Sequence, residues 1–470
     1  MRKQIATLVI VSLLLNLLPV PLGRGRAEAF SVGEEKEVGE KLLSMVRKNF
    51  QVLDDPDISQ YVNDLGQRIL TVAGPQYFDY HFFVIKDKEF NAFAAPSGLI
   101  FIHSGLIETM ESEGELVSVM AHEVAHVTSR HISDRLAKQA KTTIGTAALL
   151  IAGIIMGGGG ALGQALITGS MAAGATMNLK FSREDEEEAD RLSFKWMQAL
   201  QTDPSDMETM LRRMHRVSVY RMANIPPYLL THPEPLQRLG YVQDLILSSD
   251  QGKGYQTRDN FSFLRMKHRV LALTRDPATL KTQYLRKAAQ GNEQQALMTK
   301  YGLALLSLAG ADYPKALALM KEVIHSSPDR SILQTDLATI LMQSGRRQEA
   351  LSLLKAAHAA APNDAYTTYT LAQNLEQLGD QQQALHLFRD LLPVIPDHGM
   401  LYHTIGNLET RLGKKGVGHY FLGHYFWMEG DPKNAKYHLE ETLRSPAVDQ
   451  ATLTKARNLL SDIERIEKEM

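Results

Sequence analysis

The sequence contains no cysteine and no excess of charge of either sign, and both absences exclude classes of protein. Without cysteine there are no disulfides, no thiolate catalysis and no cysteine ligands for zinc, so His, Asp and Glu remain to hold any metal ion. With 51 basic and 53 acidic residues, the chain lacks the electrostatic signature of a nucleic-acid-binding protein. At 470 residues it is long enough for two or three domains, each with its own core.

The N-terminus carries the pattern of an export signal. Arg2 and Lys3 precede a mostly apolar run from Ile5 to Leu18, and Ala27 to Ala29 offers small residues for cleavage. This pattern predicts a signal peptide over residues 1–29 and a secreted mature protein. An uncleaved membrane anchor is the alternative, although a run of about 14 residues is short for a membrane span.

Residues 121–126 read Ala-His-Glu-Val-Ala-His, the HExxH pattern. On a helix, His122 and His126 project from the same face and can bind one metal ion. Ser112 and Glu115 form the Ser-x-x-Glu pattern of a capping box, and apolar residues at helical spacing follow. Glu123 is placed to accept a proton from water at the metal without being a ligand. The pattern predicts a hydrolytic zinc site; a helix with two ordinary histidines is the alternative.

Two histidines leave a tetrahedral zinc ion one protein ligand short, and the acidic segment 182–190 can supply it. Ser182 can cap a helix there, whose acidic first turn suits the positive helix N-terminus. We expect Glu186 to reach the metal and Asp190, one turn further on, to bond a histidine ring nitrogen and fix its tautomer. Periodicity alone does not choose between Glu184, Glu186, Glu187 and Glu188.

The segment before the metal helix predicts helices and then strands. Residues 32–72 have apolar residues at helical steps, interrupted near Asp54 to Pro56, and predict two amphipathic helices. The runs Tyr80 to Ile85 and Leu99 to Ile102 predict strands. Between them lies Asn91-Ala92-Phe93-Ala94. An edge strand here can hold a peptide substrate through main-chain hydrogen bonds, and a plain hairpin without that role is the alternative.

Together, these motifs resemble the zinc metallopeptidase family that includes HtpX and the CAAX prenyl proteases. The resemblance covers roughly residues 32–245 and includes Thr231-His232-Pro233 downstream of the acidic segment. It implies one Zn2+ per chain with Glu123 as the base, and a catalytic or other polar role near the metal for His232 and for Arg238. The metal ligands that it implies are His122, His126 and Glu186, with Asp190 as the supporting carboxylate. From the residues alone, His232 is a histidine before a proline in a loop.

The stretch from Thr142 to Leu179 carries no charge and holds nine glycines, with Gly157 to Gly160 dividing it into two halves. The first half is short for a spanning helix, which needs about 20 predominantly apolar residues. We therefore predict a buried or lid-forming insertion between His126 and Glu186. Contact with a membrane, peripheral or embedded, is the alternative.

The C-terminal third has an internal period of 34 residues, shown by Pro328, Pro362 and Pro396 and by Ala316, Ala350 and Ala384. That period and pattern predict tetratricopeptide repeats. We expect at least four helix pairs, Pro393 inside the second helix of the third pair, and a last helix that includes Ala451 to Ile466.

The predicted fold is mainly α: an α+β HExxH zinc metallopeptidase domain followed by an α-helical tetratricopeptide solenoid. The predicted segments are the signal peptide 1–29, the peptidase domain 30–250, a helical connector 251–290 and the repeats 291–470.

A signal peptide, a peptidase and repeats in this order resemble bacterial periplasmic proteases of outer-membrane protein quality control. The resemblance implies a periplasmic location, associated with the outer membrane, and a metalloendopeptidase that degrades misfolded or stalled outer-membrane proteins. It also implies that the repeats contact the outer-membrane β-barrel assembly machinery. Two alternatives are a tetratricopeptide chaperone or scaffold with a latent or structural zinc site, and a membrane-embedded protease.

Overall fold

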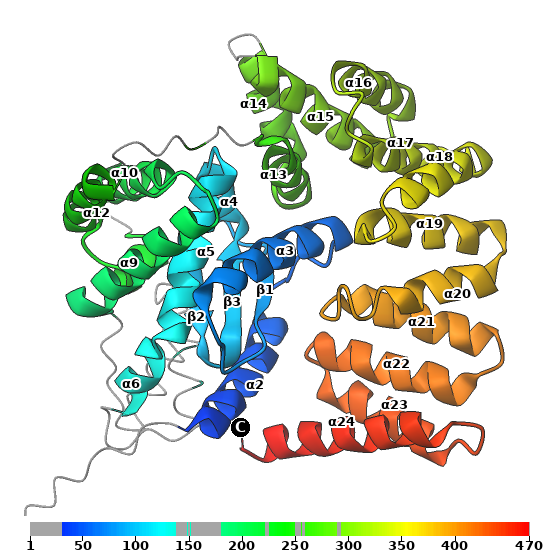
Figure 1. The fold of residues 1–470 in the computed structure, drawn as a ribbon. Coiled ribbons are helices and arrows are strands. Elements are labelled where there is room, and N and C mark those ends of the chain that lie inside the picture. The colour runs from blue at the N-terminus through cyan, green and yellow to red at the C-terminus, as the bar shows by residue number, and fades with distance from the viewer. Residues whose placement is uncertain are drawn as a thin grey trace, which may run out of the picture.

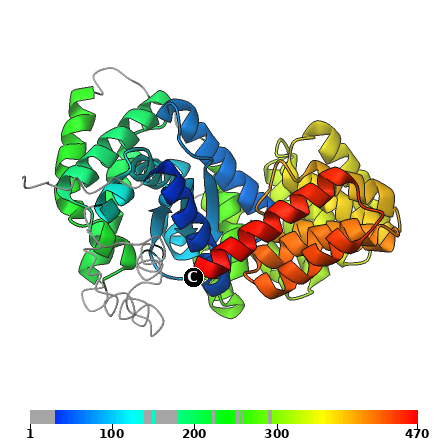
Figure 2. The same ribbon diagram turned by 90° about the horizontal axis from the view of Figure 1, so that it is seen from below.

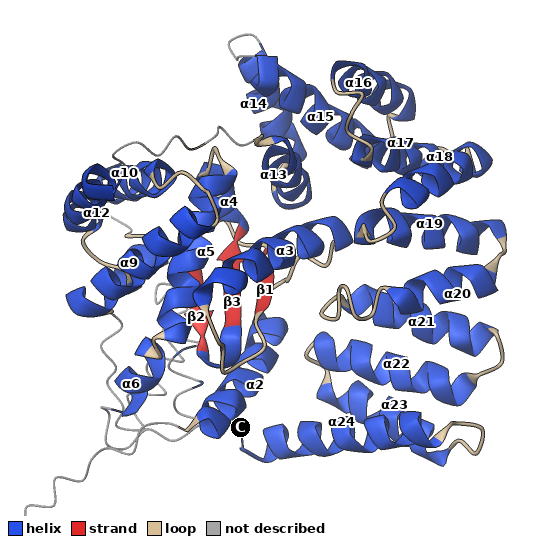
Figure 3. Ribbon diagram, in the orientation of Figure 1, coloured by secondary structure: helices blue, strands red, loops and turns tan. Residues whose placement is uncertain are grey.

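The structure is a computed structural model that describes residues 31–137, 148, 151, 180–220, 225–249, 255, 259–288 and 293–469. The predicted signal peptide lies outside the described residues, as does the stretch 142–179 apart from Ala148 and Ile151. Two lobes lie side by side: a compact lobe from α2 to α12, and an arc of helices that ends at α24 (Figure 1). Within the described residues all strands belong to the first lobe (Figure 3).

The first lobe begins with two helices, α2 (Val32–Asn49) and α3 (Pro56–Ala73), as the sequence predicts. Ser31 caps α2 in a capping box, and the carboxylate of Asp55 accepts the N–H groups of Asp57 and Ile58 at the start of α3. Pro56 occupies the first turn of α3, where its missing N–H costs nothing. Both helices bury their apolar faces in the lobe's core.

A three-stranded sheet follows, formed by β1 (His81–Ile85), β2 (Ala92–Ala95) and β3 (Leu99–His103) in the order β1-β3-β2. The two predicted strands are β1 and β3. They pair in parallel, whereas the strands of a hairpin are antiparallel, so the alternative prediction of a plain hairpin between them is wrong. The intervening segment is itself a strand, β2, which pairs antiparallel with β3 across the short turn η1 (Pro96–Gly98). This turn places Ser97 and Gly98 at φ values of 72° and 82°.

After α4 (Ser104–Thr109), the metal-motif helix α5 (Glu113–Thr128) packs between the sheet and α9 (Arg183–Ala199). Only half of the predicted capping box forms at its start. The Ser112 hydroxyl accepts the Glu115 N–H at 3.1 Å, but the Glu115 carboxylate accepts the N–H of Glu111 at 2.6 Å instead of that of Ser112. Helix α6 (His131–Ala137) follows a turn in which Arg130 has φ 56°.

Helices α10 (Ser205–Tyr220), α11 (Pro227–Thr231) and α12 (Pro235–Ser249) complete the lobe. Next come α13 (Phe261–Thr274) and α14 (Pro277–Ala288), in the stretch predicted to be a helical connector. Phe263, Met266 and Val270 of α13 belong to the core of the first lobe, whereas Phe261 packs among the first repeats. Helix α13 therefore belongs to both lobes. Among the helices that the structure describes, none combines the length and apolarity needed to cross a membrane.

The second lobe stacks five helix pairs within the described residues, which meets the prediction of at least four. Ala316, Ala350 and Ala384 are fully buried in the second helices of the first three pairs, as their 34-residue period requires. Pro393 lies in a turn and not inside a helix, because α20 already ends at Asp390. The helices are α15 (Glu293–Ala309), α16 (Tyr313–Ser326), α17 (Ile332–Gln343), α18 (Arg347–Ala360), α19 (Ala365–Leu378), α20 (Gln381–Asp390), α21 (Gly399–Arg411), α22 (Lys415–Met428), α23 (Pro432–Arg444) and α24 (Gln450–Glu469).

A buried ionic seam joins the lobes. Arg265 of α13 lies between Asp57 of α3 and Asp336 of α17, with nitrogen–oxygen distances of 2.8 Å to each. One turn on, Arg269 pairs with Asp55 at 2.9 Å. Because Arg265 is only 4% exposed, these pairs are withdrawn from water.

The arc returns to the first lobe at its far end, where α24 reaches α2 in both views (Figures 1 and 2). Arg465 of α24 pairs with Glu40 of α2 at 2.8 Å. Between the two ends of the arc, Asp397 accepts from His81 of β1 at 2.6 Å. The repeats are therefore joined to the first lobe at several separate places.

Candidate metal centre

Helix α5 presents His122, Glu123 and His126 inside the first lobe, where each is at most 2% exposed. The two histidines are one turn apart, and their Nε2 atoms lie 3.0 Å from each other. Burial lowers the pKa of His126 well below its ordinary value. A neutral imidazole is the form that binds a metal ion.

Helix α9 brings the acidic segment to these histidines. Of its candidate glutamates Glu186 is the one that is buried, at 2% exposed, and its two carboxylate oxygens lie 3.6 Å from His122 Nε2 and 3.5 Å from His126 Nε2. One turn further on, an Asp190 oxygen lies 2.9 Å from His122 Nδ1. This is the arrangement expected for a third ligand and a supporting carboxylate.

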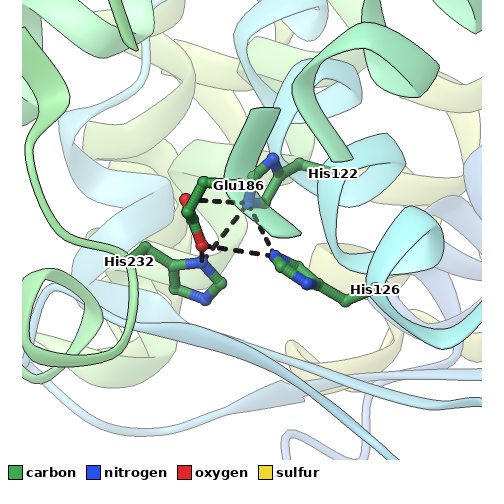
Figure 4. Close-up of side chains that lie close together, drawn as sticks. All are labelled: His122, His126, Glu186 and His232. Atoms are coloured by element: carbon green, nitrogen blue, oxygen red, sulfur yellow. Dashed lines mark hydrogen bonds and ion pairs between the residues drawn. The ribbon is translucent and has the colours of Figure 1, made fainter. Parts of the chain in front are cut away.

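His232 follows α11 and enters the same cluster (Figure 4). Its Nδ1 lies 2.8 Å from a Glu186 oxygen and 3.3 Å from His122 Nε2, and its Nε2 lies 3.5 Å from Glu123 Oε1. The ring stacks on Tyr228, with 4.4 Å between ring centroids. The loop histidine is therefore part of the site.

Arg238 of α12 supplies the compensating positive charge. Its guanidinium holds Asp190 through two bonds of 2.7 and 2.8 Å and lies 2.7 Å from Glu186. Burial acts to raise the pKa of both carboxyl groups, but the charge of Arg238 and the nearby histidines outweigh it and hold each pKa below its usual range. Both side chains are therefore anions at neutral pH.

The cluster fits a metal ion. One ligand atom from each of His122, His126, Glu186 and His232 can be chosen so that all lie within 4.8 Å of one another. Imidazole nitrogens with one carboxylate oxygen form a donor set that suits zinc and other transition metals. In addition, Glu123 Oε1 is buried and has no hydrogen-bond partner among the described residues, so its lone pairs are not used by a neighbouring donor there.

Two residues in contact with His126 were not predicted from the sequence. His131 begins α6 and places its Nδ1 2.9 Å from Nδ1 of His126. Phe181 stacks on the His126 ring, with 3.9 Å between centroids, and its N–H donates to the carbonyl of Thr231. His131 follows the motif by five residues across a left-handed turn, so helical periodicity does not reveal the contact.

The candidate substrate segment is β2, at one edge of the sheet and packed against α5. The N–H of His103 donates to the carbonyl of Asn91, which sets the antiparallel pattern. By alternation, Phe93 bonds to β3, while the backbone N–H and C=O groups of Ala92 and Ala94 point away from it. The edge strand is thus placed beside the metal helix, and at two positions its main-chain groups point away from β3.

Comparison with known families and proteins agrees with this geometry. Residues 56–246 match Peptidase family M48, and residues 341–405 match a tetratricopeptide repeat. The chain therefore carries a family M48 metallopeptidase domain followed by tetratricopeptide repeats, which confirms the predicted fold class and the family resemblance.

The chain is similar to the beta-barrel assembly-enhancing protease of Escherichia coli (strain K12), with 29% identity over 321 residues, 68% of this chain and 65% of that protein. It is 28% identical to the mitochondrial metalloendopeptidase OMA1 of Schizosaccharomyces pombe over 184 residues, 39% of this chain and 52% of that one. Among solved structures, MamA from Desulfovibrio magneticus RS-1 aligns over 33% of this chain and 96% of its own, with 18% identity and a TM-score of 0.27. The chain thus spans about 65% of the length of the beta-barrel assembly-enhancing protease.

Proposed function

We propose that this chain is a periplasmic zinc endopeptidase that degrades misfolded or stalled outer-membrane proteins. One observation carries the proposal: the buried group His122, His126, Glu186 and His232, next to a Glu123 oxygen without a hydrogen-bond partner among the described residues, lies inside a family M48 domain. A purely structural zinc site has no need of a base at position 123. This favours an enzyme over a scaffold with a structural or latent metal.

The protein residues have separate tasks in this proposal. A bound zinc ion would lower the pKa of water and polarise the substrate carbonyl. His122, His126 and Glu186 would hold the ion, while Asp190 fixes the tautomer of His122 through its Nδ1. Glu123 accepts the proton from the attacking water and can return it to the departing amine.

The edge of β2 suits an extended peptide. The outward main-chain groups of Ala92 and Ala94 can pair with the backbone of any sequence, as β-augmentation does. In this structure, however, Ala92 is fully buried, so the edge is closed to solvent. A peptide would have to displace what covers it.

The position of His232 also indicates that the site is closed in this structure. A histidine that lies 3.3 Å from His122 Nε2 and 2.8 Å from a Glu186 oxygen sits among the metal ligands, where it would exclude the attacking water. We therefore propose that the enzyme is latent until a substrate or partner moves the loop that carries His232. Stabilisation of the oxyanion is the competing role for this residue.

The repeats are proposed to recruit a protein partner, with the outer-membrane β-barrel assembly machinery as the candidate. Stacked helix pairs offer extended surfaces for proteins and not pockets for small molecules. The name of the 29% identical relatives, beta-barrel assembly-enhancing protease, supports this choice. The proposal also includes the periplasmic location, the signal peptide and the segment boundaries that the sequence predicts.

The test uses the full chain with Glu123→Gln, compared with His126→Ala. Glu123→Gln should abolish cleavage of an unstructured reporter but keep zinc, whereas His126→Ala should lose both. Cross-linking of the Glu123→Gln protein in its own cell envelope then identifies trapped substrates and partners. Full activity in the Glu123→Gln protein would refute the mechanism, because the role assigned to Glu123 would then be wrong.

A further inference from the structure

The ring of His126 has two nitrogens, and the proposed metal site uses one of them. Its Nε2 faces the cluster, 3.0 Å from His122 Nε2 and 3.5 Å from a Glu186 oxygen. Its Nδ1 faces the other way and lies 2.9 Å from Nδ1 of His131. His131 is only 5% exposed, so water does not readily replace this contact.

If Nε2 of His126 binds a metal, the ring's single proton must be on Nδ1. That N–H then donates to His131, whose own Nδ1 must be the bare acceptor. The proton of His131 is consequently on Nε2, which faces Glu188 at 3.6 Å and Asp185 at 3.9 Å. The α9 carboxylates lie beyond hydrogen-bond distance, so the contact that orients the metal ligand is the 2.9 Å bond between His126 and His131.

The two metal histidines are therefore supported differently. His122 has a carboxylate, Asp190, directly on its Nδ1. The described residues offer His126 no carboxylate on Nδ1, and the face of its ring is covered by Phe181. Without His131, the N–H of His126 would be buried and would have no acceptor among the described residues, which is unfavourable for such a group.

We propose that His131 is a positioning residue, which holds the tautomer and ring orientation of His126 so that Nε2 stays directed at the metal. The inference rests on the proposed metal site and adds a residue to it. The turn at Arg130, with φ 56°, is what brings the start of α6 back to His126. If His131 has this role, zinc affinity should depend on a hydrogen-bond acceptor at the position of His131 Nδ1.

The experiment measures zinc affinity of the purified full chain by competition with a chromogenic chelator. His131→Phe keeps a ring but removes the acceptor, and it should weaken affinity roughly 10–100-fold, as losses of such supporting partners do. His131→Asn places an amide oxygen near the position of Nδ1 and should stay within about threefold of the parent. His268→Phe, which removes a histidine bonded to Tyr284 at 2.8 Å, is the matched control and should not change affinity.

A second measurement separates positioning from general loss of structure. In histidine-labelled, zinc-loaded protein, the 15N spectrum should show a slowly exchanging Nδ1–H of His126 in the parent and in His131→Asn, but not in His131→Phe. If His131→Phe does not fold, His131→Ala serves in its place.

Equal zinc affinity in the parent and His131→Phe would overturn the inference while leaving the proposed function intact. So would an affinity for His131→Asn as low as that for His131→Phe, because an acceptor would then not be what matters. A parent protein that binds no zinc in this assay would overturn the proposed function and the inference together.

Discussion

Replacing Arg265 by methionine should weaken the seam between the lobes far more than the loss of one surface charge would. Arg265 is 4% exposed and bonds Asp57 and Asp336, on helices from different lobes. Methionine fills similar volume but leaves both carboxylates beside an apolar side chain, with only Arg269 among the described residues, 3.5 Å from Asp57 and 3.6 Å from Asp336, as a nearby cation. Breaking a buried pair in this way costs about 3–5 kcal/mol.

The dependence on pH has a defined sign. Burial already raises the pKa of Asp57, against the opposing charges of Arg265 and Arg269. Removing Arg265 raises that pKa further. A carboxyl group whose pKa is higher in the folded than in the unfolded state lowers the free energy of unfolding when the pH is above the folded-state pKa. This destabilisation decreases as the pH falls through that pKa. The loss in Arg265→Met should therefore be largest near neutral pH and smaller in mild acid.

The assay is equilibrium unfolding in urea in a series of buffers from neutral to mildly acidic pH, so that the direction of the change is measured. Adding Asp57→Asn and Asp336→Asn to Arg265→Met should recover part of the loss, because no buried charge then remains unpaired. The control is Arg191→Met, an exposed pair with Glu187 whose loss should cost under about 0.5 kcal/mol. A decrease in the free energy of unfolding of less than about 1 kcal/mol, or a decrease that does not change with pH, would refute the reasoning.

Three further predictions concern single contacts. Asp190→Ala should weaken zinc affinity roughly 10–100-fold in the chelator assay, and unchanged affinity would remove its assigned role. His232→Ala should raise cleavage of an unstructured reporter if the residue closes the site, as its 2.8 Å contact with Glu186 suggests, whereas a fall of roughly 10²–10³ would assign it to the oxyanion. The hydrogen bond to Asp397 raises the pKa of His81, so its stabilisation is present below about pH 6.5 and is lost as pH rises through the raised pKa; His81→Gln should flatten that part of a thermal unfolding profile.

Local patterns predicted the parts of the fold that depend on neighbours in sequence. The helices at 32–72, the two strands and the 34-residue repeats follow from apolar spacing and helix breakers, and they are present. The parallel pairing of β1 with β3 was not predicted, because strand periodicity does not report which neighbour a strand takes. Nor does a sequence indicate that Arg265 bonds Asp57, 208 residues away.

The site shows the same division. Spacing placed His122, Glu123 and His126 on one helix. Periodicity alone left four glutamates open, and Glu186 was preferred for its spacing to Asp190 and for the family resemblance; of the four, it is the one that is buried. The loop histidine His232 entered only through family resemblance. The contact of His131 depends on a backbone turn, and no periodic pattern encodes it.

The several separate contacts between the lobes restrict how the molecule can move. A domain attached at one edge can swing about a single hinge, whereas the repeats meet the first lobe both at α13 and, through Arg465 and Glu40, at α24. Rotation about either contact would break the other. Motion that preserves both is confined to small sliding and bending shared along the stacked helices.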